Sequence, residues 1–74
     1  MNAVTTYAVF LFDTTTAALW AEEVALDRGI PAEVIPAPAD TDAKCDLALR
    51  SRAEHERSLT EALEQMGVAF RPYV

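Results

Sequence analysis

The chain has 74 residues, of which 51% are hydrophobic, and carries a formal net charge of −6. This length predicts one domain over residues 1–74, and no apolar run reaches the roughly 18 residues of a membrane span. The acidic charge argues against a nucleic-acid partner. A single cysteine excludes an internal disulfide and suits a reducing cytoplasm, and the N-terminus lacks the basic and apolar regions of a signal peptide.

The first half of the chain predicts a strand followed by a helix. Residues 6–12 are rich in β-branched and aromatic side chains, as strands are, and both faces of this strand are apolar, which indicates a central position. The Asp and Thr residues at 13–16 suit a helix N-cap, and Gly29 suits the end of the Ala- and Glu-rich helix that follows. Trp20 lies off the inward stripe of this helix, as a partly covered surface residue or as a subunit contact. The inward stripe comprises Ala17, Ala18, Ala21, Val24, Ala25 and, at its edge, Arg28.

The second half predicts two strands, a helix and a final strand. Residues 32–37 indicate a short edge strand, because its proline lacks an N–H donor. Residues 45–50 alternate between apolar and polar, as a half-buried strand does. A helix is expected over residues 53–66 and a last strand over residues 68–74. The inward stripe of this second helix comprises Leu59, Ala62, Leu63 and Met66.

The order of these elements predicts an α+β fold, the ferredoxin-like β-α-β-β-α-β sandwich. Its sheet would be antiparallel in strand order 4-1-3-2, with both helices on one face. Because the first strand is apolar on both faces, the open face of the sheet should pack against something. We therefore expect a homodimer or higher oligomer, formed sheet to sheet or through Trp20.

Cys45 stands where an irregular loop gives way to the third strand. In the predicted topology this point meets the end of the first strand, and so lies near the first turn of the first helix. A helix N-terminus and neighbouring donors or cations stabilise a thiolate, whereas nearby carboxylates oppose it. The residues placed to stabilise it are Lys44, Thr14, Thr15 and Thr16. The opposing carboxylates are those of Asp13, Asp42 and Asp46. The residues alone leave open whether Cys45 is a reactive thiol or a small buried hydrophobe.

Three segments resemble a family of small bacterial domains of unknown function, described as selenium/sulfur carrier-like proteins. They are Gly-Ile-Pro at 29–31, Val-Ile-Pro-Ala-Pro at 34–38 and Cys-Asp-Leu-Ala-Leu-Arg at 45–50. The family pattern at the third segment is Ser-Cys-Gly followed by apolar, Ala, apolar and basic residues; here Lys44 replaces the Ser and Asp46 the Gly. The resemblance spans nearly the whole chain. It implies that Cys45 holds sulfur or selenium as a persulfide or selenosulfide.

The resemblance also implies donor and acceptor proteins as partners. The candidate docking residues are Arg50, Arg52 and Arg57, although such a basic cluster is also typical of a plain solvated surface. The alternative function is a non-enzymatic oligomeric regulatory or protein-interaction module in which the cysteine is structural. A turnover enzyme is not expected, because the sequence holds no catalytic triad, carboxylate pair or phosphate-binding glycine loop. No metal and no cofactor are expected, since no ligand cluster is present.

Overall fold

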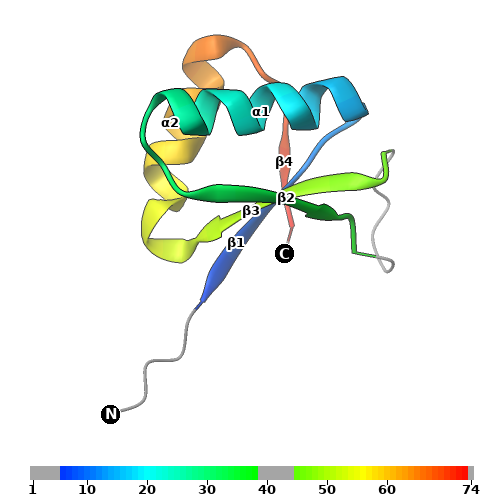
Figure 1. Ribbon diagram of the computed structural model, residues 1–74, viewed down its shortest axis with the longest axis horizontal. Coiled ribbons are helices and arrows are strands. Elements are labelled where there is room, and N and C mark those ends of the chain that lie inside the picture. Colours follow the sequence, from blue (N-terminus) through cyan, green and yellow to red (C-terminus); the bar gives the residue numbers. More distant parts are fainter. Residues whose placement is uncertain (1–5, 39–44, 74) are drawn as a thin grey trace.

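The computed structural model describes residues 6–38 and 45–73 of the chain (Figure 1). The predicted elements occur in the predicted order. They are β1 (Tyr7–Leu11), α1 (Thr15–Asp27), β2 (Ala32–Pro36), β3 (Leu47–Arg52), the short 3-10 helix η1 (Ala53–His55), α2 (Glu56–Met66) and β4 (Arg71–Pro72). None of the helices in these described ranges has the length and apolar character needed to cross a membrane.

The four strands form one antiparallel sheet in the order β2-β3-β1-β4, which is the predicted order read from the other edge. β1 lies between β3 and β4, so the prediction that it is central is confirmed. β2 is an edge strand, as its terminal proline predicted. The register of the central pair runs from Tyr7 opposite Arg52 to Leu11 opposite Ala48.

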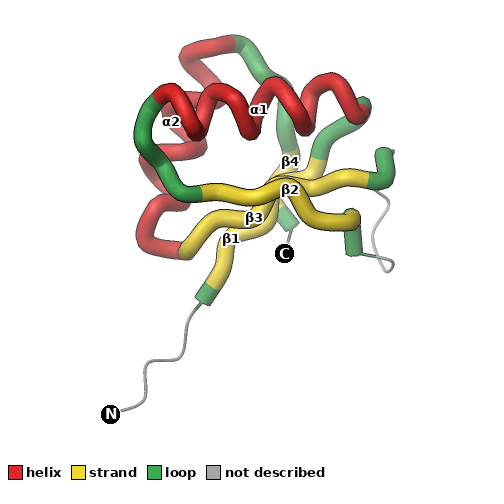
Figure 2. The backbone as a smooth tube through the Cα atoms, in the orientation of Figure 1, coloured by secondary structure: helices red, strands yellow, loops and turns green. Residues whose placement is uncertain are grey.

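Both helices lie on one side of the sheet (Figure 2). α1 contacts β2, β3 and α2, and the helices share one core with the inward face of β1. Small residues on α1 allow it to approach the sheet closely, because alanine adds little volume between backbone layers. The buried residues of the two helices are Ala18, Ala21, Val24 and Ala25 of α1, and Leu59, Ala62 and Leu63 of α2.

Glycines end both helices in the left-handed conformation that the sequence predicts. Gly29 has φ of 69° and Gly67 has φ of 77°, a region that side chains with a Cβ adopt at a cost. After α2 the N–H of Val68 donates to the carbonyl oxygen of Leu63 at 2.9 Å, which brings Val68 into the core. Met66, expected to face inward, is exposed instead, whereas Val68 just after the turn is buried.

The last strand is shorter than predicted. It comprises only Arg71 and Pro72, whereas the sequence suggests a strand over residues 68–74. The N–H of Val68 is bonded to Leu63 at the end of α2, so it does not pair with β1, and Pro72 has no N–H to donate to β1. The N–H of Tyr73 nevertheless donates to the carbonyl oxygen of Val9 at 2.9 Å, so the chain still follows the sheet edge past the strand.

Candidate functional site

Cys45 lies two residues before β3, in the bend that leads the chain into the sheet. The N–H of Ala37, which follows β2, donates to the carbonyl oxygen of Asp46 at 2.8 Å. This bond extends the β2–β3 pairing beyond both strands, since the last pair within them is Pro36 with Leu47. The backbone beside Cys45 is thereby fixed at one end of the sheet.

The side chain of Cys45 is half-buried and packs against the core. Its thiol donates a hydrogen bond to the carbonyl oxygen of Leu47, with the sulfur and oxygen atoms 3.0 Å apart. Packing of this kind suits a small hydrophobe, while the residue as a whole keeps part of its surface exposed to solvent. A thiolate has no proton to donate, so the sulfur must give up the bond to Leu47 when it reacts.

The start of α1 lies at the same end of the sheet as Cys45. Leu11 at the end of β1 pairs with Ala48 near the start of β3. Thr14, the N-cap of α1, follows Leu11 by three residues, and Cys45 precedes Ala48 by three residues. The first turn of α1 and the start of β3 accordingly share the right-hand side of Figure 1. The register supports the predicted neighbourhood, and direct contact between Cys45 and the threonines stays a prediction.

The residues proposed to stabilise a thiolate differ in their surroundings. The hydroxyl oxygen of Thr14 accepts a hydrogen bond from the N–H of Ala17 at 3.0 Å, which caps the helix. Thr15 and Thr16 are exposed in the first turn of α1. Lys44 lies outside the described residues. The N-cap prediction is therefore confirmed for Thr14, whose hydroxyl oxygen already serves the helix.

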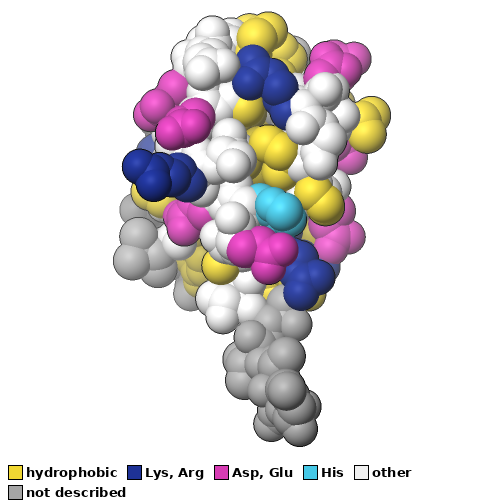
Figure 3. Space-filling view, turned by 90° about the vertical axis from the view of Figure 1, so that its left-hand side faces the viewer, with side chains coloured by type: hydrophobic (Ala, Val, Ile, Leu, Met, Phe, Trp, Pro, Cys, Tyr) yellow, Lys and Arg dark blue, Asp and Glu magenta, His cyan; other side chains and the backbone are white. Residues whose placement is uncertain are grey.

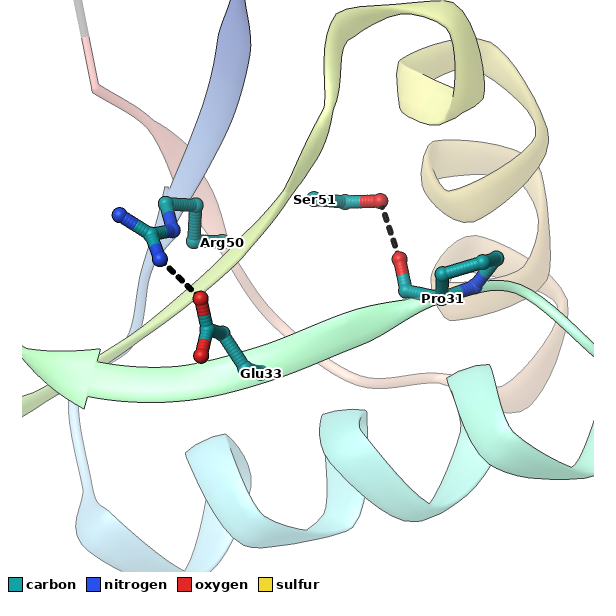
Figure 4. A network of polar contacts seen from close by, with 4 residues as sticks. All are labelled: Pro31, Glu33, Arg50 and Ser51. Atoms are coloured by element: carbon teal, nitrogen blue, oxygen red, sulfur yellow. Dashed lines mark hydrogen bonds and ion pairs between the residues drawn. The ribbon is translucent and has the colours of Figure 1, made fainter.

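Arg50 is held by intramolecular contacts on the open face of the sheet (Figure 4). Its guanidinium pairs with the carboxylate of Glu33 on β2, which stands opposite Arg50 in the strand register. The guanidinium carbon also lies 4.6 Å from the ring centroid of Tyr7. The hydrogen bond that the guanidinium donates to the Glu33 carboxylate raises the pKa of Arg50. Part of the Arg50 guanidinium is therefore already engaged by Glu33, so a docking partner would use its remaining N–H groups or displace Glu33.

The other two candidate docking arginines are freer. Arg52 is exposed at the end of β3. Arg57 is exposed on α2 and approaches Glu61, one turn further, at 3.8 Å, a surface pair that contributes little stability. The face shown in Figure 3 carries basic and acidic side chains around the histidine rather than one basic patch. Docking through these arginines stays a prediction.

Ser51 is a buried polar residue that the sequence reasoning missed. It is 3% exposed, and its hydroxyl donates to the carbonyl oxygen of Pro31 at 2.6 Å, joining β3 to the turn that precedes β2 (Figure 4). The signal was present in the sequence, because continuing the alternation of residues 45–50 by one step places Ser51 on the inward face. This bond fixes the edge strand against the sheet next to the end of α1.

Ser51→Ala is expected to lower the free energy of unfolding by about 1–2 kcal/mol, because the carbonyl of Pro31 loses its donor. Urea denaturation monitored by circular dichroism measures the change. Ser58→Ala, at an exposed position of α2, provides the matched control and should change stability little. Equal stability of the two variants would show that the hydroxyl of Ser51 contributes nothing.

The described residues contain no group of three or more His, Cys, Asp or Glu side chains able to hold a metal ion. The open groove beside Trp20, along α1, does not include Cys45 among its lining residues. On the open face of the sheet, Tyr7 is exposed whereas Leu11 and Ala48 are buried. Self-association through this face or through Trp20 stays a prediction.

Comparison with known proteins gives one family. The sequence model of the family described as "Putative Se/S carrier protein-like" matches residues 7–74. Neither the curated proteins nor the solved structures gave a significant match to the chain. The matched span begins at the first residue of β1 and contains Cys45, both helices and the whole sheet.

Proposed function

Because the chain belongs to the Se/S carrier protein-like family, we propose that it carries a sulfur or selenium atom on Cys45. The observation that carries the proposal is the position of this thiol, which is the one cysteine of the chain and lies half-buried at the end of the sheet within the family match. The strand order supports a ferredoxin-like scaffold. A reducing cytoplasm is the compartment that suits such a thiol.

The proposed loading step is an exchange between sulfur atoms. The Cys45 thiolate attacks the outer sulfur of a persulfide on a donor protein, a bond forms between the two sulfurs, and the donor's own sulfur–sulfur bond breaks. The donor cysteine leaves as a thiolate, so no external oxidant or reductant is consumed. Selenium transfer follows the same course and leaves a selenosulfide on Cys45.

The start of α1 is the proposed site for the charge that develops during this exchange. The first N–H groups of a helix have no partner within the helix, and its N-terminus favours negative charge. The N–H of Ala17 already donates to the hydroxyl oxygen of Thr14. The N–H groups of Thr15 and Thr16 are therefore the ones proposed to stabilise the negative charge. Lys44 is the proposed cation beside the sulfur. The exposed carboxylate of Asp46 has the opposite effect, because it repels the negative charge of an approaching persulfide donor.

Loading is tested with a cysteine desulfurase and cysteine as the sulfur source. The native protein is expected to gain the mass of one sulfur atom, and a thiol reductant should remove it. The Asp46→Gly variant, which restores the family residue beside the thiol, is expected to load at least as fast. If several donors add no sulfur to either protein, the carrier function is wrong.

The second candidate function is an interaction module in which Cys45 only packs against the core. The half-buried sulfur and its bond to Leu47 favour this alternative. Treatment of the folded protein with iodoacetamide separates the two candidates, with the urea-unfolded chain as the reference for full reactivity. A carrier should be alkylated while folded, whereas a thiol that reacts only after unfolding would support the module.

A further inference from the structure

An open groove of about 740 Å³ runs along α1, from Thr16 in its first turn to the turn into β2, and Cys45 is not among its lining residues. Trp20 and Leu26 line it, with 42% and 77% of their surfaces exposed, and Leu19 lies beside them. These side chains contact solvent while the alanines of the same helix fill the core. A helix that is apolar on two sides is typical of one covered by a second partner.

The charge around the groove selects the kind of partner. Glu22 and Glu23 are among the lining residues, and none of the arginines in residues 6–38 and 45–73 lines the groove. We propose that this groove docks a segment of another protein that carries apolar side chains flanked by lysine or arginine. The apolar side chains would cover Trp20 and Leu26, and the flanking cations would meet the two carboxylates. Charge complementarity of this kind speeds association and rejects partners of the wrong sign.

A second copy of this chain fits the groove less well. A two-fold contact uses the same surface of both subunits, so it would bring two grooves of the same acidic character together. Like charges brought together in this way oppose association. The groove also reaches Ala32, the first residue of the edge strand β2, where a partner would cover part of an open sheet edge.

Trp20 is the one tryptophan of the chain, so its fluorescence reports directly on the groove. The probe is a short amphipathic peptide of leucine and lysine, compared with a peptide in which glutamate replaces every lysine. We expect the lysine peptide to shift the emission of Trp20 to shorter wavelength with saturation, and the glutamate peptide to leave it unchanged. No shift with either peptide, an equal shift with both, or a shift with protein concentration alone would overturn the proposal.

Matched charge reversals separate the groove from the overall charge. Glu22→Lys combined with Glu23→Lys should weaken binding of the lysine peptide on the order of tenfold. Glu61→Lys combined with Glu64→Lys changes the net charge of the protein by the same amount, but on α2. This variant should bind the lysine peptide as the native protein does. Leu26→Ser should also weaken binding without unfolding, because this side chain is largely exposed. If both double variants lose peptide binding equally, the loss comes from the overall charge of the protein and not from the groove. None of these outcomes depends on the chemistry of Cys45.

Discussion

Replacing Phe10 with alanine is expected to lower the free energy of unfolding by about 3–5 kcal/mol. Phe10 is 2% exposed in β1, an interior strand, where it lies opposite Leu49 of β3 and Pro72 of β4. Its ring meets that of Phe70 edge to face, with the centroids 5.5 Å apart. A domain of this length holds roughly 4–11 kcal/mol of stability in total, so the variant loses a large part of it.

Urea denaturation of Phe10→Ala and of the native protein measures this loss. Leu26→Ala is the matched control, because it removes an apolar side chain of similar kind from an exposed position and should change stability little. Phe10→Leu should fall between the two, since it keeps apolar volume at the site but loses the contact with Phe70. A Phe10→Ala variant as stable as the Leu26→Ala control would contradict the assignment of Phe10 to the core.

The order of the strands could be predicted because a few residues determine it. The two apolar faces of β1 require a central strand, and Pro36 requires an edge. Gly29 and Gly67 mark the ends of α1 and α2, and a helix that joins two strands leaves the chain little choice of connection. These signals are local or follow from topology. Two of these residues, Gly29 and Pro36, also belong to the segments that resemble the family, which the comparison confirms.

The surface contacts could not be predicted from the sequence, because they depend on the strand register and on the direction of each side chain. Arg50 looks like a free cation in the sequence, and its pairing with Glu33 follows only once β2 and β3 are aligned residue by residue. The groove beside Trp20 likewise requires the position of α1 relative to β2. For Cys45, the pattern of β3 predicts an inward side chain but not how much of the sulfur stays accessible.

Replacing Cys45 with serine is expected to abolish sulfur loading completely while the fold persists. The chain has no other cysteine, so no second thiol can accept the atom. A serine hydroxyl at this position can still donate to the carbonyl oxygen of Leu47, which keeps the bend before β3 in place. The expected change in stability is therefore within about 1 kcal/mol. Mass spectrometry after exposure to the donor and circular dichroism of the same sample measure the two effects.

Two further measurements make the serine variant decisive. If it gains the same mass as the native protein, the sulfur is not bound to Cys45 and the carrier proposal fails. Glutathione persulfide, a donor too small to need a docking surface, should load the native protein and the Glu22→Lys, Glu23→Lys variant equally. Cys45→Ser should stay unloaded with this donor as well. Loss of loading from a protein donor alone in the groove variant would then identify the groove as the place where that donor docks, because the thiol itself still reacts.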